Sequence, residues 1–441
     1  MNTLEALRLG KLKGSKKLKL ACGLKIFPKE IFDLSETLEI LDLTDNALSD
    51  LPHDFHKLKK LKILFLSNNL FREVPSILAK CTNLTMIGIR NNQINVLKEN
   101  VLPLNIRWLI LTDNNLKKLP DSLGNLQYLQ KCMLSGNRLE SLPQSLSNCK
   151  NLELLRISSN KLTKLPIWLL QLPKLSWLAY SGNPFCAKHP SCDTPIDEVL
   201  WENLKIEEKL GEGASGEIYK AIWKDEEVAL KIFKGSMTSD GLPQEEMDIN
   251  ISMGKHTHLI DVLARVTGHP EGRDVLMLEL IPSKFYNLGL PPSLESCTRD
   301  IYPKDFELNI AMSIKILVAM ASAALHMHQR GIMHGDFYAH NILIDQEGHS
   351  ILGDFGGASY YEPKEKEIRD ALERLEVRAF GCLIEEFLLL SQKDTTLDTL
   401  KTKLEQIKDA CLSNPNSRRP LFQSIYKDIH SLYTKSTLNF N

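Results

Sequence analysis

Apolar residues recur in a fixed pattern along the first half of the chain. From about residue 18 to residue 183 the sequence repeats the pattern Leu-x-x-Leu-x-Leu-x-x-Asn, and Gly23 stands one period before the first asparagine. Each unit is too short to bury its apolar side alone and does so only by stacking on its neighbours. The pattern therefore predicts eight stacked units. Their asparagines follow at intervals of 22 or 23 residues and are Asn46, Asn69, Asn92, Asn114, Asn137, Asn160 and Asn183.

Most units also carry a Leu-Pro or Val-Pro pair, as at Leu51-Pro52 and Val74-Pro75. Proline ends one segment there and begins the convex side of the unit. With seven matching units, this region resembles the leucine-rich-repeat family. The resemblance implies an α/β leucine-rich-repeat solenoid over residues 1–195. In such repeats the leucines point into the stack, and each Asn side chain satisfies backbone groups at the turn that follows its strand.

The strand of each repeat should expose an apolar stripe on the concave face. Side chains alternate between the two faces of a strand, so the residues on either side of the second leucine point outward. These positions include Phe65, Trp108 and Trp177, which the stability of a solenoid does not require. Large exposed apolar patches usually mark interaction sites. We expect a protein partner on this face; alternatively, the stripe packs against the chain's own second domain or against a second copy in a homo-oligomer.

A proline-containing linker separates the repeats from a different pattern that begins near Trp201. Gly211, Gly213 and Gly216 form a Gly-x-Gly-x-x-Gly motif between two strand-like segments. By itself this motif also fits a simple turn or a dinucleotide-binding loop. Its position between two strands favours a flap over the phosphates of ATP, because small residues let backbone amides approach anionic oxygens.

Lys231 lies in an apolar strand-like segment, Val228-Ala229-Leu230-Lys231. An unpaired ammonium group would be costly there, so the lysine needs an anion. The segment resembles the Val-Ala-Ile-Lys strand of protein kinases, in which the lysine binds phosphates of ATP and pairs with a glutamate of a helix. Glu245 and Glu246 are adjacent candidates for that glutamate, and we choose Glu246.

Two more motifs follow in the order and at the spacing that protein kinases use. Asp336 is followed five residues later by Asn341, and Asp354 begins an Asp-Phe-Gly sequence 18 residues after Asp336. These segments resemble the catalytic loop and the metal-binding motif of that family. Four motifs in order make a chance match remote. The resemblance covers residues 201–435 and implies an α+β bilobal protein-kinase-like domain.

The resemblance also implies ATP and Mg²⁺ as cofactors and a role for each motif residue. Asp336 would accept or orient the proton of the acceptor hydroxyl, while Asn341 and Asp354 would hold Mg²⁺. Lys231, paired with Glu246, would anchor ATP. The implied nucleotide-binding residues are Gly211, Gly213, Ser215, Gly216, Ile218, Ala229, Lys231, Glu279 and Ile281.

The catalytic region departs from the family in three places. Gly335 replaces the arginine that receives an activation-loop phosphate in many kinases, so that switch is absent. Tyr338 replaces the lysine that is common two residues after the catalytic aspartate, although the nearby His340 could partly neutralise charge there. The interval from Asp354 to Glu376 is only 22 residues and contains no Ala-Pro-Glu motif, so the usual peptide-docking segment is shortened.

These motifs predict a protein serine/threonine kinase whose repeats bind a protein partner or substrate. One alternative is a kinase-like scaffold with weak or no transfer. Another is a small-molecule kinase, which the short segment after Asp354 favours and a large protein-binding solenoid disfavours.

Composition adds few constraints. The 441 residues carry a net charge of −1, which makes nucleic acid a poor partner. We found no signal peptide and no apolar stretch near the ~18 residues of a membrane span, so we expect a cytoplasmic chain, with export as an effector as an alternative. Nine scattered cysteines fit reduced thiols. Cys186, His189 and Cys192 could supply three metal ligands, but no fourth is evident, so we interpret their spacing as coincidence.

Overall fold

The structure is a computed structural model that describes residues 3–186, 196–213, 215–235, 237–238, 240–361, 365–391 and 398–438. Residues in contact form two compact units. The first unit comprises residues 1–174 and 183–185, and the second comprises residues 175–182 and 186–441. The segment 175–182, which is the strand region of the last repeat, therefore belongs to the second unit by its contacts.

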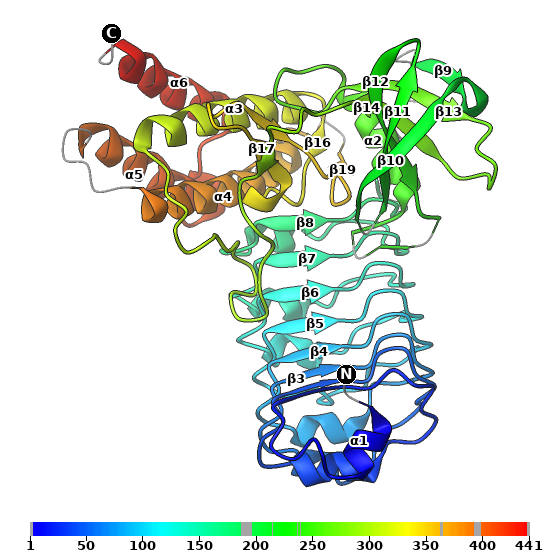
Figure 1. Cartoon of the computed structure of the whole chain (residues 1–441). Coiled ribbons are helices and arrows are strands. Elements are labelled where there is room, and N and C mark those ends of the chain that lie inside the picture. Colours follow the sequence, from blue (N-terminus) through cyan, green and yellow to red (C-terminus); the bar gives the residue numbers. More distant parts are fainter. Residues whose placement is uncertain are drawn as a thin grey trace. The chain divides into compact units, whose positions relative to one another are not determined.

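The repeats form the predicted solenoid. Each repeat contributes one three-residue strand, and the strands are hydrogen-bonded in parallel in sequence order (Figure 1). A short helix α1 (Leu4–Arg8) precedes them, and short 3-10 helices follow most of the strands. The strands are β1 (Lys17–Lys19), β2 (Ile40–Asp42), β3 (Ile63–Phe65), β4 (Met86–Gly88), β5 (Trp108–Ile110), β6 (Lys131–Met133), β7 (Leu154–Arg156) and β8 (Trp177–Ala179). The 3-10 helices are Lys29–Leu34, Phe55–Lys57, Ser76–Lys80, Asp121–Asn125, Gln144–Asn148 and Ile167–Gln171.

The asparagines form a ladder along the solenoid, as the pattern predicted. Asn137 is buried; its Oδ1 accepts a hydrogen bond from the Leu116 amide at 3.0 Å, and its Nδ2 donates to the Leu111 and Leu134 carbonyls, both at 2.9 Å. The side chain thereby links its own repeat to the preceding one. Buried backbone groups are costly to leave unpaired, and the side-chain amide pairs with them, which a leucine side chain could not do.

The concave side of the first unit carries aromatic side chains that pack on their neighbours. A Cβ atom at Gly88 would lie 2.9 Å from Cδ1 of Phe65, so the missing side chain makes room for the phenyl ring of the preceding repeat. The Nζ of Lys131 lies 4.1 Å from the ring centroid of Trp108. Phe65 and Trp108 both remain partly accessible.

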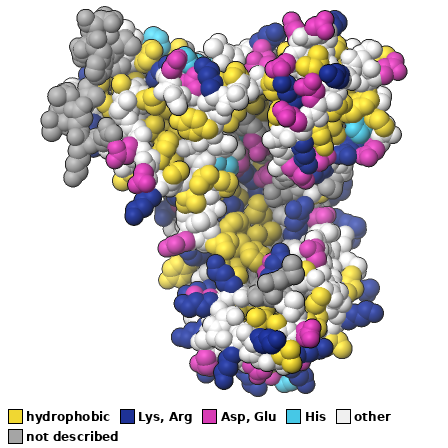
Figure 2. Space-filling view, viewed as in Figure 1, with side chains coloured by type: hydrophobic (Ala, Val, Ile, Leu, Met, Phe, Trp, Pro, Cys, Tyr) yellow, Lys and Arg dark blue, Asp and Glu magenta, His cyan; other side chains and the backbone are white. Residues whose placement is uncertain are grey.

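The basic residues of the first thirty positions lie at the surface of the N-terminal end, where Lys and Arg side chains are frequent (Figure 2). Some of them pair with acidic residues in β2 or directly before it. Lys16 lies 3.2 Å from Glu39, and Lys19 lies 3.3 Å from Asp42. These exposed pairs contribute little stability, but they reduce the local positive charge.

The second unit has the α+β composition that the kinase resemblance implied. Its six-stranded sheet has the order β10-β11-β12-β14-β13-β9 (Figure 1). Helix α2 (Pro243–Met253) packs on this sheet through Met247 and Ile251, which share a core cluster with Phe233. The strands are β9 (Asp197–Leu200), β10 (Lys205–Glu212), β11 (Gly216–Trp223), β12 (Glu226–Phe233), β13 (Val262–Thr267) and β14 (Val275–Glu279).

The remainder of the second unit is mainly helical, which confirms the predicted fold class. Its helices are α3 (Ile310–Gln329), α4 (Lys366–Leu390), α5 (Asp398–Leu412) and α6 (Phe422–Leu438). Its short strands are β15 (Tyr286–Asn287), β16 (Ile332–Met333), β17 (Ile342–Ile344), β18 (Ser350–Leu352) and β19 (Ser359–Tyr360).

Helix α3 is long and apolar enough to cross a membrane by length and composition, which the sequence analysis did not recognise. In the structure, 61% of its apolar window is buried inside the protein. Ile314, Leu317 and Met320 are among its fully buried residues. The apolar character of α3 therefore has an explanation in the core of the second unit.

Candidate active site

The glycine-rich motif joins β10 to β11, as expected from its two flanking strands. An ideal Cβ on Gly216 would lie 2.7 Å from the carbonyl oxygen of Ile232, so only glycine fits beside β12. Gly211 and Gly213 have open space around them instead. Close packing against the backbone of β12 thus requires glycine at position 216, whereas Gly211 and Gly213 lie in open space.

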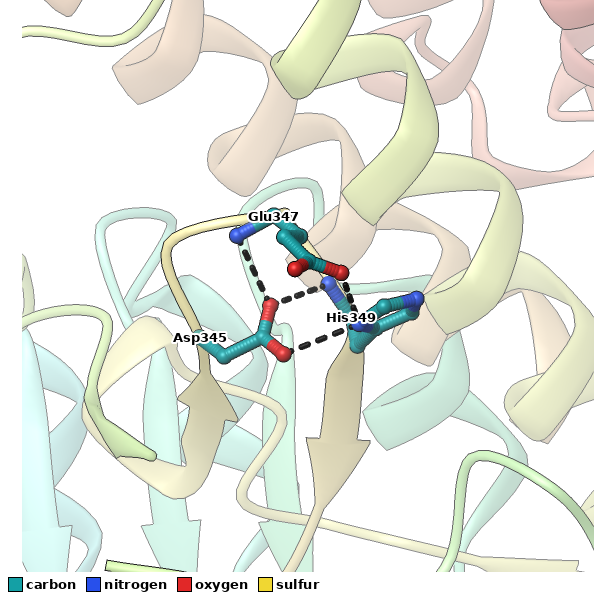
Figure 3. A group of neighbouring side chains, drawn as sticks. All are labelled: Asp345, Glu347 and His349. Carbon is teal, nitrogen blue, oxygen red and sulfur yellow. Dashed lines mark hydrogen bonds and ion pairs between the residues drawn. The ribbon is translucent and has the colours of Figure 1, made fainter. Parts of the chain in front are cut away.

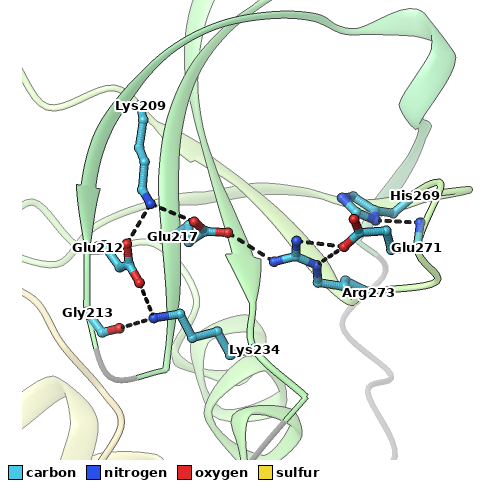
Figure 4. A network of polar contacts seen from close by, with 8 residues as sticks. All are labelled: Lys209, Glu212, Gly213, Glu217, Lys234, His269, Glu271 and Arg273. Carbon is cyan, nitrogen blue, oxygen red and sulfur yellow. Dashed lines mark hydrogen bonds and ion pairs between the residues drawn. The ribbon is translucent and has the colours of Figure 1, made fainter. Parts of the chain in front are cut away.

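A network of charged side chains surrounds this turn (Figure 4). Lys209 lies 2.6 Å from both Glu212 and Glu217, and Lys234 lies 2.5 Å from Glu212 and donates to the Gly213 carbonyl at 3.1 Å. Arg273 reaches Glu217 at 3.0 Å. Hydrogen bonds from Lys209 and Lys234 lower the pKa of Glu212 to about 2. The glycine-rich turn is therefore tied to the next two strands from its exposed side.

Lys231 and Glu246 form a buried ion pair between β12 and α2. Glu246 is 3% exposed, so an isolated carboxylate would be costly there. Burial lowers the pKa of Lys231, but the nearby carboxylates of Glu246 and Asp354 outweigh that effect and raise it. The lysine is therefore protonated at neutral pH. The structure brings together the two residues chosen from the sequence.

A cavity of about 250 Å³ opens beside this pair. Its lining includes seven residues of the predicted site: Gly213, Ser215, Gly216, Ile218, Lys231, Glu246 and Asp354. Among the residues that the structure describes, the lining does not include the other predicted ones: Gly211, Ala229, Glu279, Ile281, Asp336 and Asn341. Sequence reasoning missed four lining residues, Thr238, Asp240, Asn250 and Ile260, because they lie between motifs and carry no pattern of their own.

Asp336 and Asn341 lie together on the loop between β16 and β17. The Nδ2 of Asn341 donates to Oδ2 of Asp336 at 2.9 Å and to its carbonyl at 2.8 Å. On the other side, Glu376 of α4 accepts hydrogen bonds from the His334 and Gly335 amides at 3.1 and 2.8 Å. Burial raises the pKa of Glu376, but these bonds and the contact with His328 outweigh it and lower the pKa. A buried carboxylate thus holds the loop from beneath.

Asp354 follows β18 with a positive φ of 53°, a conformation that L-residues adopt rarely. Its Oδ1 accepts from the Gly356 amide at 3.3 Å. The ring of His334 lies 3.1 Å from the Gly353 carbonyl, which connects this turn to the loop that carries Asp336. Strained backbone conformations are enriched at functional sites, where surrounding contacts hold them.

His340 is held by a residue that the sequence analysis did not select. Its Nδ1 lies 2.7 Å from Oδ1 of Asp300, whose Oδ2 accepts from the His340 amide at 3.1 Å. Burial lowers the pKa of His340, but Asp300 and the nearby Asp336 and Asp354 outweigh it and raise the pKa. Asp300 precedes the loop by about 40 residues, so no spacing in the sequence pointed to it.

Trp177 corrects the prediction for the concave stripe. It was expected on the exposed face, but its side chain is 1% exposed. Its ring stacks on Tyr338 with centroids 4.2 Å apart and planes 7° apart. Trp177 is therefore unavailable to a separate partner, because Tyr338 of the same compact unit covers its ring. For this residue the alternative, packing against the chain's own second domain, is right.

One more group of potential metal ligands lies outside the predicted site, formed by Asp345, Glu347 and His349 (Figure 3). Lys284 lies 2.9 Å from Asp345, which also accepts from the Glu347 and His349 amides. These partners lower the pKa of Asp345 although burial opposes them. The group is therefore explained as the polar turn between β17 and β18. Of the other ligand candidates, His189 and Cys192 lie outside the described residues.

The residues that line the cavity, together with Asp336 and Asn341, have the chemistry to bind a nucleotide with a divalent cation. A charged, partly enclosed lysine suits phosphate oxygens, and Gly216 leaves backbone close to the cavity. Carboxylate and amide oxygens of Asp354 and Asn341 are ligand types that Mg²⁺ accepts. The Asp336 carboxylate is positioned beside that amide, so the site can combine charge neutralisation with proton acceptance.

Comparison with known proteins supports the family resemblance of both halves of the chain. A model described as protein kinase domain matches residues 204–380, and a leucine rich repeat model matches residues 36–94, 104–162 and 127–185. A protein of Acanthamoeba polyphaga mimivirus named as a serine/threonine-protein kinase/receptor is 31% identical over 163 residues, or 36% of this chain. A Dictyostelium discoideum protein named as a serine/threonine-protein kinase is 24% identical over 209 residues, or 43% of this chain. The chain spans only 9% and 21% of the lengths of these two relatives.

Proposed function

We propose that this chain, which joins leucine-rich repeats to a protein kinase domain, transfers the γ-phosphate of ATP to a serine or threonine hydroxyl of a protein. The observation that carries the proposal is that five predicted site residues form two groups within one compact unit. Lys231 pairs with Glu246, Asp354 lines the same cavity, and Asn341 holds the carboxylate of Asp336. Relatives named as serine/threonine-protein kinases support the choice of acceptor.

ATP would bind in the cavity beneath the glycine-rich turn. Lys231 would contact its phosphates, and Glu246 would keep the lysine oriented. The predicted contacts at Gly211, Gly213, Ser215, Gly216 and Ile218 would cover the phosphates, while Ala229, Glu279 and Ile281 would contact the adenine. A cover of this kind excludes water, which favours transfer to the acceptor over hydrolysis.

Mg²⁺ would be held by Asp354 and Asn341 and would neutralise charge on the phosphates. Asp336 would accept or orient the proton of the acceptor hydroxyl. The hydrogen bond from Asn341 to Asp336 keeps the two roles adjacent. His340 supports the proposal further, because Asp300, Asp336 and Asp354 raise its pKa despite burial and so favour a positive charge near Asp336, where Tyr338 replaces the usual lysine.

The first unit would bind a protein partner or substrate at the concave positions that remain accessible, Phe65 and Trp108. Aromatic residues are enriched where binding energy concentrates. A substitution Phe65→Ser should raise KM for a protein substrate and leave KM for ATP unchanged. If wild type and Phe65→Ser had equal KM values for the protein substrate, this face would not be the substrate-binding surface. We also propose a cytoplasmic setting, which the free cysteines among the described residues fit.

The experiment that tests the main proposal is label transfer from γ-labelled ATP with Mg²⁺ and a generic basic protein. Wild-type protein should label serine or threonine, and Asp336→Asn should reduce the rate by about 10³-fold or more, because proton acceptance and acceptor alignment are both lost. ATP binding by the variant should persist. Label in a small molecule would favour a small-molecule kinase. ATP binding without any transfer would favour a scaffold.

A further inference from the structure

The strand of the last repeat contacts the catalytic loop at several points. The Nε1 of Trp177 donates a hydrogen bond to the carbonyl of Phe337 at 3.0 Å, and its ring stacks on Tyr338. Phe337 and Tyr338 directly follow the catalytic candidate Asp336. One side chain of a repeat therefore contacts both the backbone and a side chain of the loop that carries the proposed base.

Two hydrogen bonds fix the same strand to neighbouring parts of the second unit. The Tyr180 amide donates to Oγ of Ser359 in β19 at 3.0 Å. Arg378 of α4 donates to Oγ of Ser176 at 2.7 Å. Ser176, Trp177 and Tyr180 are all buried. The position of Trp177 relative to the loop is thus set by contacts on both sides of it.

The backbone of this strand also explains why position 335 is a glycine. Gly335 has a φ of +70°, and an ideal Cβ there would lie 2.7 Å from the Leu178 carbonyl and 2.4 Å from the Gly357 carbonyl. No arginine side chain can leave the backbone in that direction. The space that the missing arginine would need is occupied by the repeat strand and by the segment after Asp354.

Tyr338, the second departure, lies between two aromatic partners. Its ring is 4.2 Å from Trp177 and 5.0 Å from His340, measured between centroids. His340 is fixed in turn by Asp300. A lysine at position 338 could not make the parallel stack with an indole ring that tyrosine makes. The substitution therefore matches the presence of Trp177.

We propose that strand β8 is part of the catalytic machinery, with Trp177 as a positioning residue that holds the Asp336 loop through Phe337 and Tyr338. The proposal rests on the kinase function proposed above. It assigns the holding of this loop to a repeat strand, in a chain whose interval from Asp354 to Glu376 is only 22 residues. The loop is then held in a transfer-competent position without a phosphate on that segment.

The test compares three forms of the full chain: wild type, Trp177→Phe and Trp177→Ala. Loss of the stack and the hydrogen bond together removes interactions of about 1–3 kcal/mol, which would lower kcat about 5- to 150-fold if they act only in the aligned state. The Phe variant keeps a stacking ring and should lie between wild type and Ala. KM for ATP should stay within about twofold, because Lys231 and the glycine-rich turn are not changed.

Trp168→Ala provides a matched control. Trp168 belongs to the 3-10 helix Ile167–Gln171, which follows strand β7 of the preceding repeat, and is partly exposed. Its kcat should equal that of wild type. Wild-type kcat in folded Trp177→Ala, or an equal loss in Trp168→Ala, would overturn the proposal.

Hydrogen exchange separates this proposal from the kinase function itself and needs no activity. In Trp177→Ala the amides of residues 335–341 should exchange faster than in wild type, while the repeats keep their protection. If Trp177→Ala is globally unfolded, the milder Trp177→Phe is measured in its place. Unchanged exchange in a folded variant overturns the positioning role. Faster exchange in a chain whose wild-type form transfers no phosphate leaves the positioning role standing and removes the kinase function.

Discussion

Replacing Gly335 by alanine tests the close contact between the last repeat strand and the loop that carries Asp336. The new Cβ would lie 2.4 Å from the Gly357 carbonyl and 2.7 Å from the Leu178 carbonyl. Real Cβ atoms essentially never approach backbone that closely, so one of the two segments must move. The cost combines a positive-φ alanine, about 1 kcal/mol, with overpacking of about 1–3 kcal/mol. We therefore expect Gly335→Ala to destabilise the second unit by about 2–4 kcal/mol.

The assay is urea unfolding, followed by a signal from the second unit because a chain with two units need not unfold in one step. Gly272→Ala is the control, since Gly272 has a similar φ of +64° but no atom within 4 Å of its ideal Cβ. The control should lose only about 1 kcal/mol, the cost of the backbone conformation. Equal losses in the two variants would refute the reasoning, because the contact with Leu178 and Gly357 would then carry no cost.

Three further predictions concern separate parts of the chain. Lys231→Ala should abolish transfer from γ-labelled ATP, and wild-type turnover would contradict the assigned role. The change also leaves Glu246 as an uncompensated buried carboxylate, so the free energy of unfolding, measured by thermal unfolding, should fall by about 3–5 kcal/mol. Asn137→Ala leaves three backbone groups without their side-chain amide partner and should destabilise the repeats by about 1–3 kcal/mol in urea unfolding. As a control, the same change at the exposed Asn125 should cost under about 0.5 kcal/mol. Burial lowers the pKa of His256 from 6.5 to about 4, so the unfolded chain binds a proton at a higher pH than the folded chain does. The free energy of unfolding should therefore fall as the pH drops from about 6.5 to 4. His256→Gln should reduce this pH dependence, and an unchanged dependence would show that His256 is not its source.

Local pattern was sufficient wherever a residue acts on its near neighbours in sequence. The spacing of Asn137 and its equivalents determined the ladder, because an amide at a turn satisfies backbone of its own and the preceding repeat. The interval from Asp336 to Asn341 likewise placed an acid and an amide on one short loop. The solenoid followed from its repeat pattern, since repeat stacking is a short-range rule, whereas the fold of the second half was implied by its resemblance to protein kinases.

Only the tertiary structure decided which distant residues meet. Glu245 and Glu246 are equivalent in the sequence, but the rotation of α2 against β12 directs Glu246 to Lys231. Asp300 reaches His340 from about 40 residues away, and Trp177 reaches Tyr338 from about 160. The outward position of Trp177 in its strand was predictable from alternation; its burial was not. A strand pattern determines on which side a side chain lies, but burial depends on what packs against that side.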